Sequence, residues 1–417
     1  MLTMKKILAI ILIGFFSFTL CPALVQAKPL YKSQLGVNVH WALDAFDANG
    51  RTESFLKNTG TKWVREHFYT KLLEDNNDAW LARYDYVVDR YKNNGINVVG
   101  MLAYGPEADK QFQISDIGRW KRYIRFLVER YKSSIHVWQV WNEPDSRDFL
   151  QPNTMANYRK ILWSAYEVIK EVDPSATVLT AGISYPNESF IKELYETSRG
   201  HFDALALHLY HCRDYRDDST NRELEDSLDN LYNNVIKKYN PNEKIWVTEM
   251  GCSTEGGVSE SLQKEYLMKK VPYVANLPYV NKIFLYTYRD RETGNSYEDH
   301  FGLIDRSMDP KPVFWWYASI MKGPYNQFEM IPGRLSAKAV ELRRGLENYF
   351  GAGRIPVSEK NWSTLVDAYV YGGYPIPAIA RAIKFGGKTV HPSIPWSAWS
   401  QTALYQEWIK KNPFASK

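Results

Sequence analysis

Two glutamates, Glu143 and Glu249, each follow a short apolar run and stand far apart in the chain. Glu143 lies in W-N-E-P at residues 141–144, and Glu249 lies in W-V-T-E-M-G at residues 246–251. Two carboxylates that converge on one bond can divide the work, because one protonates the leaving oxygen while the other attacks the carbon. This is the chemistry of glycosidic bond cleavage with retention, which requires carboxyl groups roughly 5 to 5.5 Å apart.

Eight apolar runs alternate with amphipathic segments and predict a parallel sheet of β/α units. The helical segment 155–172 is typical of the intervening parts, and the last helix of the series is expected at 312–321. Eight such units predict an α/β fold of the (β/α)8 TIM barrel type. The predicted strands span residues 34–41, 62–66, 97–104, 136–143, 176–182, 204–210, 244–249 and 282–288.

Polar and aromatic side chains stand at the carboxyl ends of these strands, which is where active sites of such barrels lie. Strands four and seven face each other across the mouth, so Glu143 and Glu249 are expected to converge. Taken singly, Glu143 can instead cap the following helix, and Glu249 can pair structurally with Arg65. The residues expected to bind substrate beside them are Trp41, Arg65, Tyr104, Asn142, His208, Tyr210, Tyr286 and Tyr288.

The motifs around both glutamates resemble those of clan A glycoside hydrolases, a retaining group built on this barrel. The stretch from W-N-E-P-D-S-R-D-F-L to D-P-S-A-T-V is most similar to family 39 and its bacterial exopolysaccharide hydrolase relatives, with family 5 close behind. H-L-Y at 208–210 is similar to the strand-six motif of the clan. The resemblance implies that Glu143 is the general acid/base and Glu249 the nucleophile.

The resemblance also implies roles for the neighbours of the two glutamates. Asn142 would hydrogen-bond the 2-hydroxyl of the sugar, Tyr210 would donate to Glu249, and Arg65 would keep Glu249 ionised. His208 would orient Glu143 or a sugar hydroxyl. The clan often ends strand eight in a tryptophan, whereas this chain has Y-T-Y-R-D, so Tyr286 or Tyr288 would take that place.

The remaining histidines and cysteines give weaker indications. His40, His67 and His211 also stand near strand ends and are expected to be hydrogen-bonded loop residues. No H-x-H or H-E-x-x-H spacing occurs, so we expect neither a metal nor another cofactor. Cys212 and Cys252 follow neighbouring strands, and whether they form a disulfide is left open.

The ends of the chain differ in composition from the barrel. Lys5 and Lys6 precede the apolar run 7–20, which predicts a signal peptide at 1–27 and a secreted, extracellular or cell-envelope protein with no membrane span in its mature form. The barrel is assigned to 28–325. Residues 326–417 predict a helical module, with helices at 335–350, 361–371 and 377–385, whose role is open and which can contact cell wall or glycan.

These features favour an exported retaining glycoside hydrolase that acts on a poly- or oligosaccharide. A net charge of +5, spread over mixed segments, gives no reason to expect nucleic acid as a partner. Two alternatives stay open on the sequence alone. One is a carbohydrate-binding barrel without catalysis, and the other is a transglycosylase that passes the same covalent intermediate to a sugar acceptor.

Overall fold

A computed structural model describes residues 33–43, 51–69, 78–103, 116–184, 187–210, 212, 227–322, 334–351, 355, 365 and 376–385. The predicted signal peptide, Tyr104, His211 and the predicted helix at 361–371 lie outside these residues, position 365 excepted. The proposed boundary between residues 325 and 326 also lies outside them. Within the described part of the chain, no helix is both long enough and apolar enough to cross a membrane.

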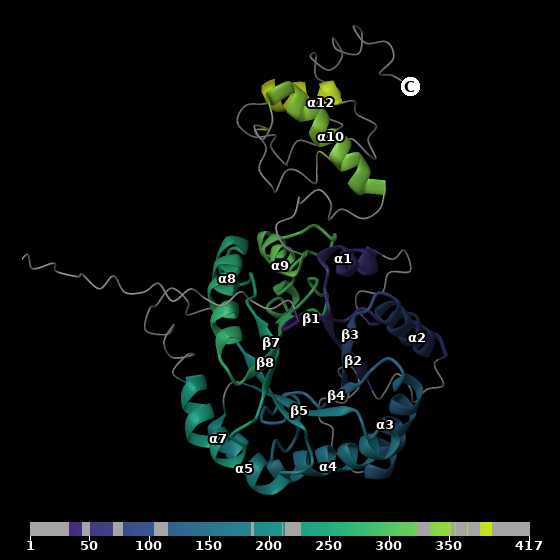
Figure 1. The fold of residues 1–417 in the computed structure, drawn as a ribbon, viewed down its shortest axis with the longest axis vertical. Helices are drawn as coiled ribbons and strands as arrows, with labels where there is room; N and C mark the ends of the chain where they lie inside the picture. Colours follow the sequence, from purple (N-terminus) through teal and green to yellow (C-terminus); the bar gives the residue numbers. More distant parts are fainter. Residues whose placement is uncertain are drawn as a thin grey trace, which may run out of the picture.

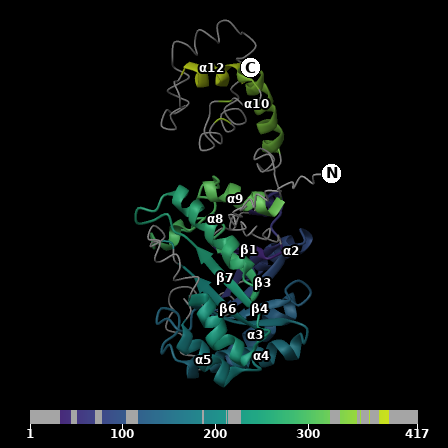
Figure 2. The ribbon, with the colours of Figure 1, turned by 60° about the vertical axis from the view of Figure 1, so that its left-hand side comes forward.

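Eight parallel strands close into a barrel in sequence order, and helices surround it (Figures 1 and 2). The last strand pairs with the first, so no sheet edge remains unpaired within the barrel. The predicted (β/α)8 TIM barrel is confirmed. Its strands are β1 (Leu35–Val39), β2 (Trp63–Tyr69), β3 (Asn97–Ala103), β4 (Val137–Val140), β5 (Thr177–Ser184), β6 (Ala204–Leu209), β7 (Ile245–Gly251) and β8 (Val280–Tyr286).

Amphipathic helices cover the outside of the barrel, and polar residues begin several of them. The side chain of Asp116 accepts a hydrogen bond from the amide of Arg119 at the start of α3, and Asn187 caps α5 in the same way. Helices α8 and α9 pack against each other. The outer helices are α1 (Arg51–Thr59), α2 (Asp78–Asn93), α3 (Ile117–Tyr131), α4 (Met155–Val172), α5 (Glu188–Ser198), α7 (Lys237–Tyr239), α8 (Glu260–Asn276) and α9 (Pro312–Lys322).

The interior of the barrel has an apolar layer and a polar layer. The apolar layer contains Val99, Val137, Leu179, Ala206, Trp246 and Phe284. The polar layer consists of Asn38, Arg65, Gln139 and Thr248, all fully buried. The amide of Asn38 donates to the carbonyl of Thr248 at 2.9 Å, and the amide of Gln139 donates to the hydroxyl of Thr248 at 3.1 Å. These hydrogen bonds join β1, β4 and β7 beneath the mouth of the barrel.

Two strand boundaries differ from the prediction in ways that affect the site. Strand β4 ends at Val140, not at Glu143, because the backbone turns out of the sheet at Trp141, where φ is 78°. Strand β2 continues to Tyr69, so Arg65 lies inside the strand and not at its end. An apolar-run pattern locates a strand, but a local change of φ decides where its backbone leaves the sheet.

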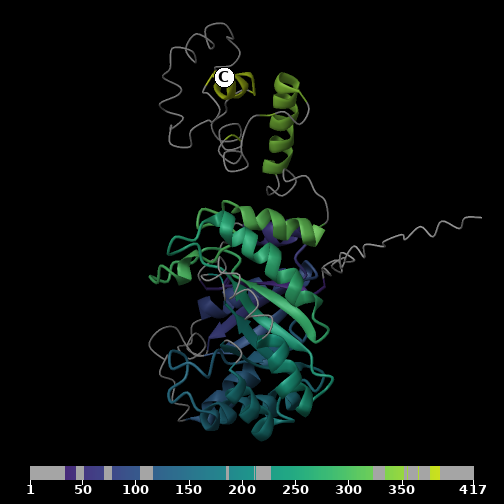
Figure 3. The same cartoon turned by 90° about the vertical axis from the view of Figure 1, so that its left-hand side faces the viewer.

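Two of the helices predicted after the barrel are present. They are α10 (Arg334–Phe350) and α12 (Ile376–Phe385), shown in green and yellow in Figure 3. They contact each other closely where Gly345 meets Ile376, since a Cβ on Gly345 would lie 2.5 Å from the Ile376 side chain. A glycine at this position lets the two helices approach.

Candidate active site

The loop after β4 holds Glu143 at the mouth of the barrel. The amide of Trp141 donates to the carbonyl of Leu102 at 2.8 Å, and the amide of Glu143 donates to the carbonyl of Gly182 at 3.1 Å. Trp141 and Glu143 both adopt positive φ, which is rare for residues other than glycine and is held here by these hydrogen bonds. The loop therefore fixes the Glu143 backbone to the neighbouring strands β3 and β5.

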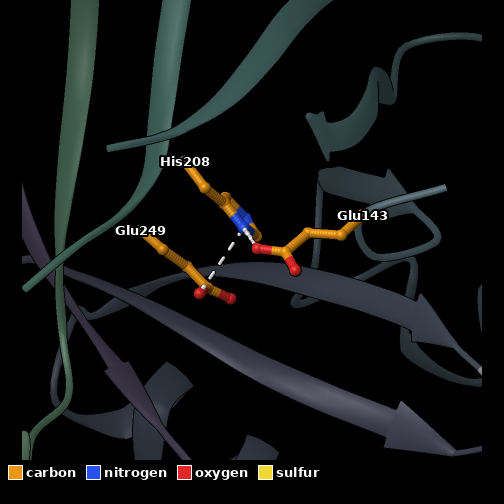
Figure 4. A group of neighbouring side chains, drawn as sticks. All are labelled: Glu143, His208 and Glu249. Carbon is orange, nitrogen blue, oxygen red and sulfur yellow. Dashed lines mark hydrogen bonds and ion pairs between the residues drawn. The ribbon is translucent and has the colours of Figure 1, made fainter. Parts of the chain in front are cut away.

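His208 joins the two glutamates. Its Nδ1 lies 2.7 Å from Oε1 of Glu143 and 3.5 Å from Oε2 of Glu249 (Figure 4). One nitrogen of His208 and one carboxylate oxygen from each glutamate all lie within 4.8 Å of one another. The two carboxylates predicted to converge from β4 and β7 therefore do meet at the mouth of the barrel.

Glu249 is held by two further side chains inside the barrel mouth. Nη1 of Arg65 lies 2.6 Å from Oε1 of Glu249, and the hydroxyl of Tyr210 donates to Oε2 at 2.5 Å. Arg65 is itself fixed, because its Nε donates to Gln139 at 2.5 Å and its Nη1 donates to Asn38 at 2.7 Å. The polar layer of the barrel thus serves to position the Glu249 carboxylate.

The surroundings of Glu249 favour its ionised form. Burial alone would raise the pKa of Glu249, but the charges of His208 and Arg65 and the hydrogen bonds from Tyr210 and Arg65 outweigh burial. The pKa of Glu249 is therefore lowered, as expected for a carboxylate whose charged form is paired and hydrogen-bonded. An ionised carboxylate is the form that can attack a carbon atom.

We expect Arg65→Gln to move the acidic limb of the pH profile of kcat/KM to higher pH. Arg65 helps to lower the pKa of Glu249, so its removal raises that pKa, and Glu249 then takes up its proton at a higher pH. The measurement is kcat/KM for an aryl glycoside across the acidic range. Tyr210→Phe removes a single hydrogen bond and should give a smaller shift in the same direction. Acidic limbs that stay in place in both variants would contradict this account.

Gly182 gives His208 the space that its ring occupies, and sequence reasoning did not identify it. A Cβ on Gly182 would lie 1.9 Å from Nε2 of His208, so the imidazole packs directly on the β5 backbone. Because the carbonyl of Gly182 also accepts from the Glu143 amide, this one residue positions both the histidine and the glutamate. Glycine in an apolar run carries no sequence signal of such a contact.

Gly182→Ala should lower kcat/KM by about 100-fold, since displacing His208 by an ångström or so misplaces the carboxylate that it holds. We expect kcat to account for most of this decrease. The unfolding temperature is measured as well, to separate loss of activity from loss of stability. Gly118→Ala, at the start of α3, adds the same methyl group 3.2 Å from Asp116 and should leave activity unchanged. Wild-type turnover in Gly182→Ala would show that His208 does not position Glu143.

Asn142 lies beside the pair and contacts Arg65. Its Oδ1 accepts a hydrogen bond from Nη2 of Arg65 at 3.3 Å, and Asn142 also forms an isolated bridge with Gly182. The carbonyl oxygen thus faces Arg65, which sets the orientation of the side-chain amide. The role of Asn142 toward a sugar hydroxyl stays a prediction.

Of the aromatic residues predicted at strand ends, Tyr210 contacts Glu249 directly, and Tyr286 lies next to Tyr210. Its ring is 6.1 Å from that of Tyr210, and the Tyr286–Thr287 peptide bond is cis. The hydroxyl of Tyr286 donates to Glu298 at 3.3 Å and accepts from Nη1 of Arg291 at 3.1 Å. Both of these partners come from the segment after β8, where no apolar run or motif indicated a role.

The other two described aromatics, Trp41 and Tyr288, belong to the hydrophobic core. Trp41 is buried, and its ring packs edge-on against Tyr91 at 5.5 Å and Tyr86 at 6.1 Å, both of α2. Tyr288 is also buried. Their predicted contact with substrate remains a prediction, as does that of Tyr104, which lies outside the described residues.

Glu143, His208 and Glu249 are the described side chains that could offer a metal three ligand atoms. A cation at this point would have to share Glu249 with the guanidinium of Arg65, whose Nη1 is already 2.6 Å from the carboxylate. Repulsion between the two positive charges disfavours a metal, and the donor set fits acid/base chemistry better.

Cys212 and Cys252 form a disulfide, with Cα atoms 5.2 Å apart, which lies within the usual range. The bridge connects the chain just after β6 to the chain just after β7. It therefore ties together the two segments that follow His208 and Tyr210 on one side and Glu249 on the other.

Comparison with known proteins gives an independent view of these residues. Residues 60–317 match the family model described as a glycosyl hydrolase catalytic core. The matched region contains Arg65, Glu143, His208, Tyr210 and Glu249. It covers nearly all of the barrel, from just before β2 into α9.

Solved structures with the same fold include several glycoside hydrolases. A family 39 β-xylosidase from Caulobacter crescentus has a TM-score of 0.54 at 18% identity, covering 70% of this chain and 71% of that one. A family 39 glycoside hydrolase from Bacteroides cellulosilyticus has a TM-score of 0.52 at 17% identity, covering 70% of this chain but only 64% of that one. The virulence factor SghA from Agrobacterium tumefaciens has a TM-score of 0.54 at 14% identity, covering 71% and 98%.

Proposed function

Because the chain belongs to the glycosyl hydrolase catalytic core family and is thus a glycoside hydrolase, we propose that it cleaves its bond by double displacement, with retention. Glu249 is the nucleophile, and Glu143 is the general acid and then the general base. His208, Arg65 and Tyr210 position these two carboxylates. The substrate is a poly- or oligosaccharide.

The proposal is carried by the pairing of Glu143 and Glu249 within 4.8 Å across the barrel mouth. Inverting enzymes hold their two carboxyl groups roughly 6.5–9.5 Å apart, to admit a water molecule between the carboxylate and the sugar. Oxygens within 4.8 Å of each other are closer than that range, which supports the roughly 5 to 5.5 Å arrangement of retaining enzymes. The lowered pKa of Glu249 supports the same assignment.

In the first step the carboxylate of Glu249 forms a bond to the anomeric carbon while the bond to the leaving oxygen breaks. Glu143 gives its proton to that oxygen, so the leaving group departs as a neutral alcohol. In the second step Glu143 takes a proton from water, whose oxygen attacks the anomeric carbon and releases Glu249. His208, hydrogen-bonded to Glu143, holds this carboxyl group in place in both steps.

A 2-deoxy-2-fluoro glycoside with a good leaving group tests the proposal. The fluorine slows both the formation and the hydrolysis of the glycosyl-enzyme. The good leaving group makes formation fast again, so the glycosyl-enzyme accumulates. We expect one sugar bound per protein, attached to the peptide that contains Glu249, by mass spectrometry. Labelling of Glu143, or no labelling by any of several sugars whose glycosides the protein hydrolyses, would contradict the proposal. A non-catalytic binding protein would show neither hydrolysis nor labelling.

Export belongs to the same proposal. Lys5 and Lys6 before the apolar run 7–20 support a signal peptide, and the Cys212–Cys252 disulfide is typical of proteins from oxidising compartments. An exported hydrolase would meet polysaccharides outside the cytoplasm. Cell fractionation, with amino-terminal sequencing of the mature protein, is the measurement. A cytoplasmic chain that starts at Met1 would refute export without affecting the catalytic assignment.

A further inference from the structure

A cleft opens at the mouth of the barrel between the segments that follow β1 and β8. Its volume is about 50 Å³, and it is partly open to solvent. A bound water needs about 10–15 Å³ of such space, so the cleft has room for a small group such as a carboxylate. Val39, His40 and Trp41 form one wall, and residues 287–292 with Arg306 form the other. Neither Glu143 nor Glu249 lines it, so the cleft lies beside the catalytic pair.

His40 lines this cleft, and its imidazole has no hydrogen-bond partner among the described residues. The residue is 4% exposed. His40 was predicted to be a hydrogen-bonded loop residue, and its backbone carbonyl does accept from the amide of Leu43 at 3.1 Å, but the prediction does not hold for its side chain. Buried polar groups without partners are costly, so a group that supplied the missing hydrogen bond would be stabilised at His40. Burial, then the charges of Arg291 and Arg65, hold the pKa of His40 well below its usual value.

Arginines dominate the charge of the cleft. Arg289, Arg291 and Arg306 all line it, against the carboxylates of Asp290 and Glu292. Asp290 is neutralised by a buried ion pair with Lys311 at 2.7 Å. The side chain of Glu292 is 85% exposed and lies 3.9 Å from Arg306.

Arg289 is a cation of this cleft that can offer hydrogen-bond donors to an anion. Its guanidinium donates to the carbonyl of Arg306, and its Nε is buried without a partner. No carboxylate of the described residues forms an ion pair with it. A guanidinium offers donors in a planar fork that matches an anionic oxygen pair, and a neutral imidazole adds one further donor.

The cleft connects to the catalytic centre through a row of aromatic rings. His40 meets Tyr286 edge-on at 6.0 Å, Tyr286 meets Tyr210 at 6.1 Å, and Tyr210 donates to Glu249. Arg291 donates to the hydroxyl of Tyr286 from the cleft side. The cleft therefore lies two ring contacts away from Tyr210, which holds Glu249, so a group bound in the cleft would lie close to a sugar at the catalytic pair.

We propose that this cleft binds an anionic group carried by the substrate, so that the enzyme acts on an acidic glycan. The group is the carboxylate of a uronic acid or of an acidic substituent, or a sulfate ester, since these share the chemistry that Arg289 and His40 recognise. This inference rests on the proposed function, because it names the substrate class of the same site.

The test compares acidic polysaccharides with chemically neutralised forms of themselves. Carbodiimide activation followed by borohydride reduction turns carboxylates into alcohols without changing linkages, and solvolysis removes sulfate esters. Oligosaccharides of each form are titrated into the full-length Glu143→Gln variant, which should bind without turnover, and the wild type is assayed for reducing-end release. We expect the acidic form to bind at least about tenfold more tightly, as a charge-assisted hydrogen bond provides.

Arginine variants then assign the preference to the cleft. Arg289→Gln should remove most of the preference for the acidic form, whereas Arg289→Lys should keep part of it. Arg199→Gln makes the same charge change at the exposed end of α5 and should leave the preference intact. Loss of the preference after carboxyl reduction identifies a carboxylate, and loss after desulfation identifies a sulfate.

The two proposals fail in different ways. Hydrolysis of neutral forms as fast as acidic ones, or a full preference in Arg289→Gln, would overturn the acidic cleft while leaving double displacement in place. Tight binding of the acidic form with no hydrolysis of any glycan would leave the cleft in place and overturn the proposed function. A protein that binds none of the acidic oligosaccharides also counts against the cleft.

Discussion

Glu249→Gly is expected to lower kcat/KM for an activated aryl glycoside by at least about 10⁴-fold, the scale on which removal of a nucleophile acts. The substitution removes the attacking carboxylate and leaves an open space against the anomeric carbon. Glu143 and His208 keep their own hydrogen bond, so acid catalysis remains available. The measurement is release of the aryl alcohol under initial-rate conditions.

Azide should restore part of this activity. The small anion enters the space left by the Glu249 side chain, where Arg65 and Tyr210 previously held a carboxylate, and attacks the carbon from that side. The product is then a glycosyl azide of inverted configuration, identified by proton NMR.

The control for Glu249→Gly is Glu255→Gly, in the loop that follows β7. This substitution removes a carboxylate from the same side of the barrel, and the variant should have wild-type activity. Thermal unfolding of both variants is measured to show that they are folded. Full activity of a folded Glu249→Gly protein, or a rescued product of retained configuration, would refute the assignment of Glu249.

Glu143→Ala should lower kcat/KM on unactivated glycans by roughly 10²–10⁴-fold, the range expected when a general acid is lost. A dinitrophenyl leaving group departs without a proton, so the first step on that substrate should remain fast. The second step still needs a base, and the glycosyl-enzyme should therefore accumulate. The measurement is a burst of dinitrophenol followed by slow turnover.

The configuration of the azide product distinguishes the roles of the two glutamates. In Glu143→Ala azide attacks the glycosyl-enzyme from the side of the missing base, so the product should be a glycosyl azide of retained configuration. Glu188→Ala, at the exposed start of α5, is the matched control and should behave as wild type. Azide products of the same configuration from Glu143→Ala and Glu249→Gly would contradict the division of roles.

The order of the strands and the meeting of the two glutamates could be predicted from sequence. Eight apolar runs with helical segments between them specify a barrel, and the barrel places strands four and seven across its mouth. This prediction depends only on the number of β/α units, so errors of a few residues in the predicted strand ends do not affect it. The motif resemblance implied roles for Glu143 and Glu249, and the structure adds the distances from their carboxylates to His208.

The contacts that position the two glutamates were harder to predict from the sequence. Gly182 matters because the His208 ring occupies the space that a side chain at this position would need. The sequence shows that residue 182 has no side chain, but it does not show that an imidazole lies there. Arg65 was placed at a strand end, yet it lies within β2 with its side chain in the barrel. Trp41 ends an apolar run as expected, but its ring packs toward α2, because the face on which a side chain lies depends on the local backbone.

The position of Arg65 also constrains how this protein can change over evolutionary time. A descendant that kept the barrel to bind sugars but lost Glu249 would retain a buried guanidinium without its counter-charge, at a cost of about 3–5 kcal/mol. That is a large part of the roughly 5–15 kcal/mol that stabilises a typical domain. Inactive descendants should therefore have replaced Arg65 as well, so the two positions are expected to be lost together.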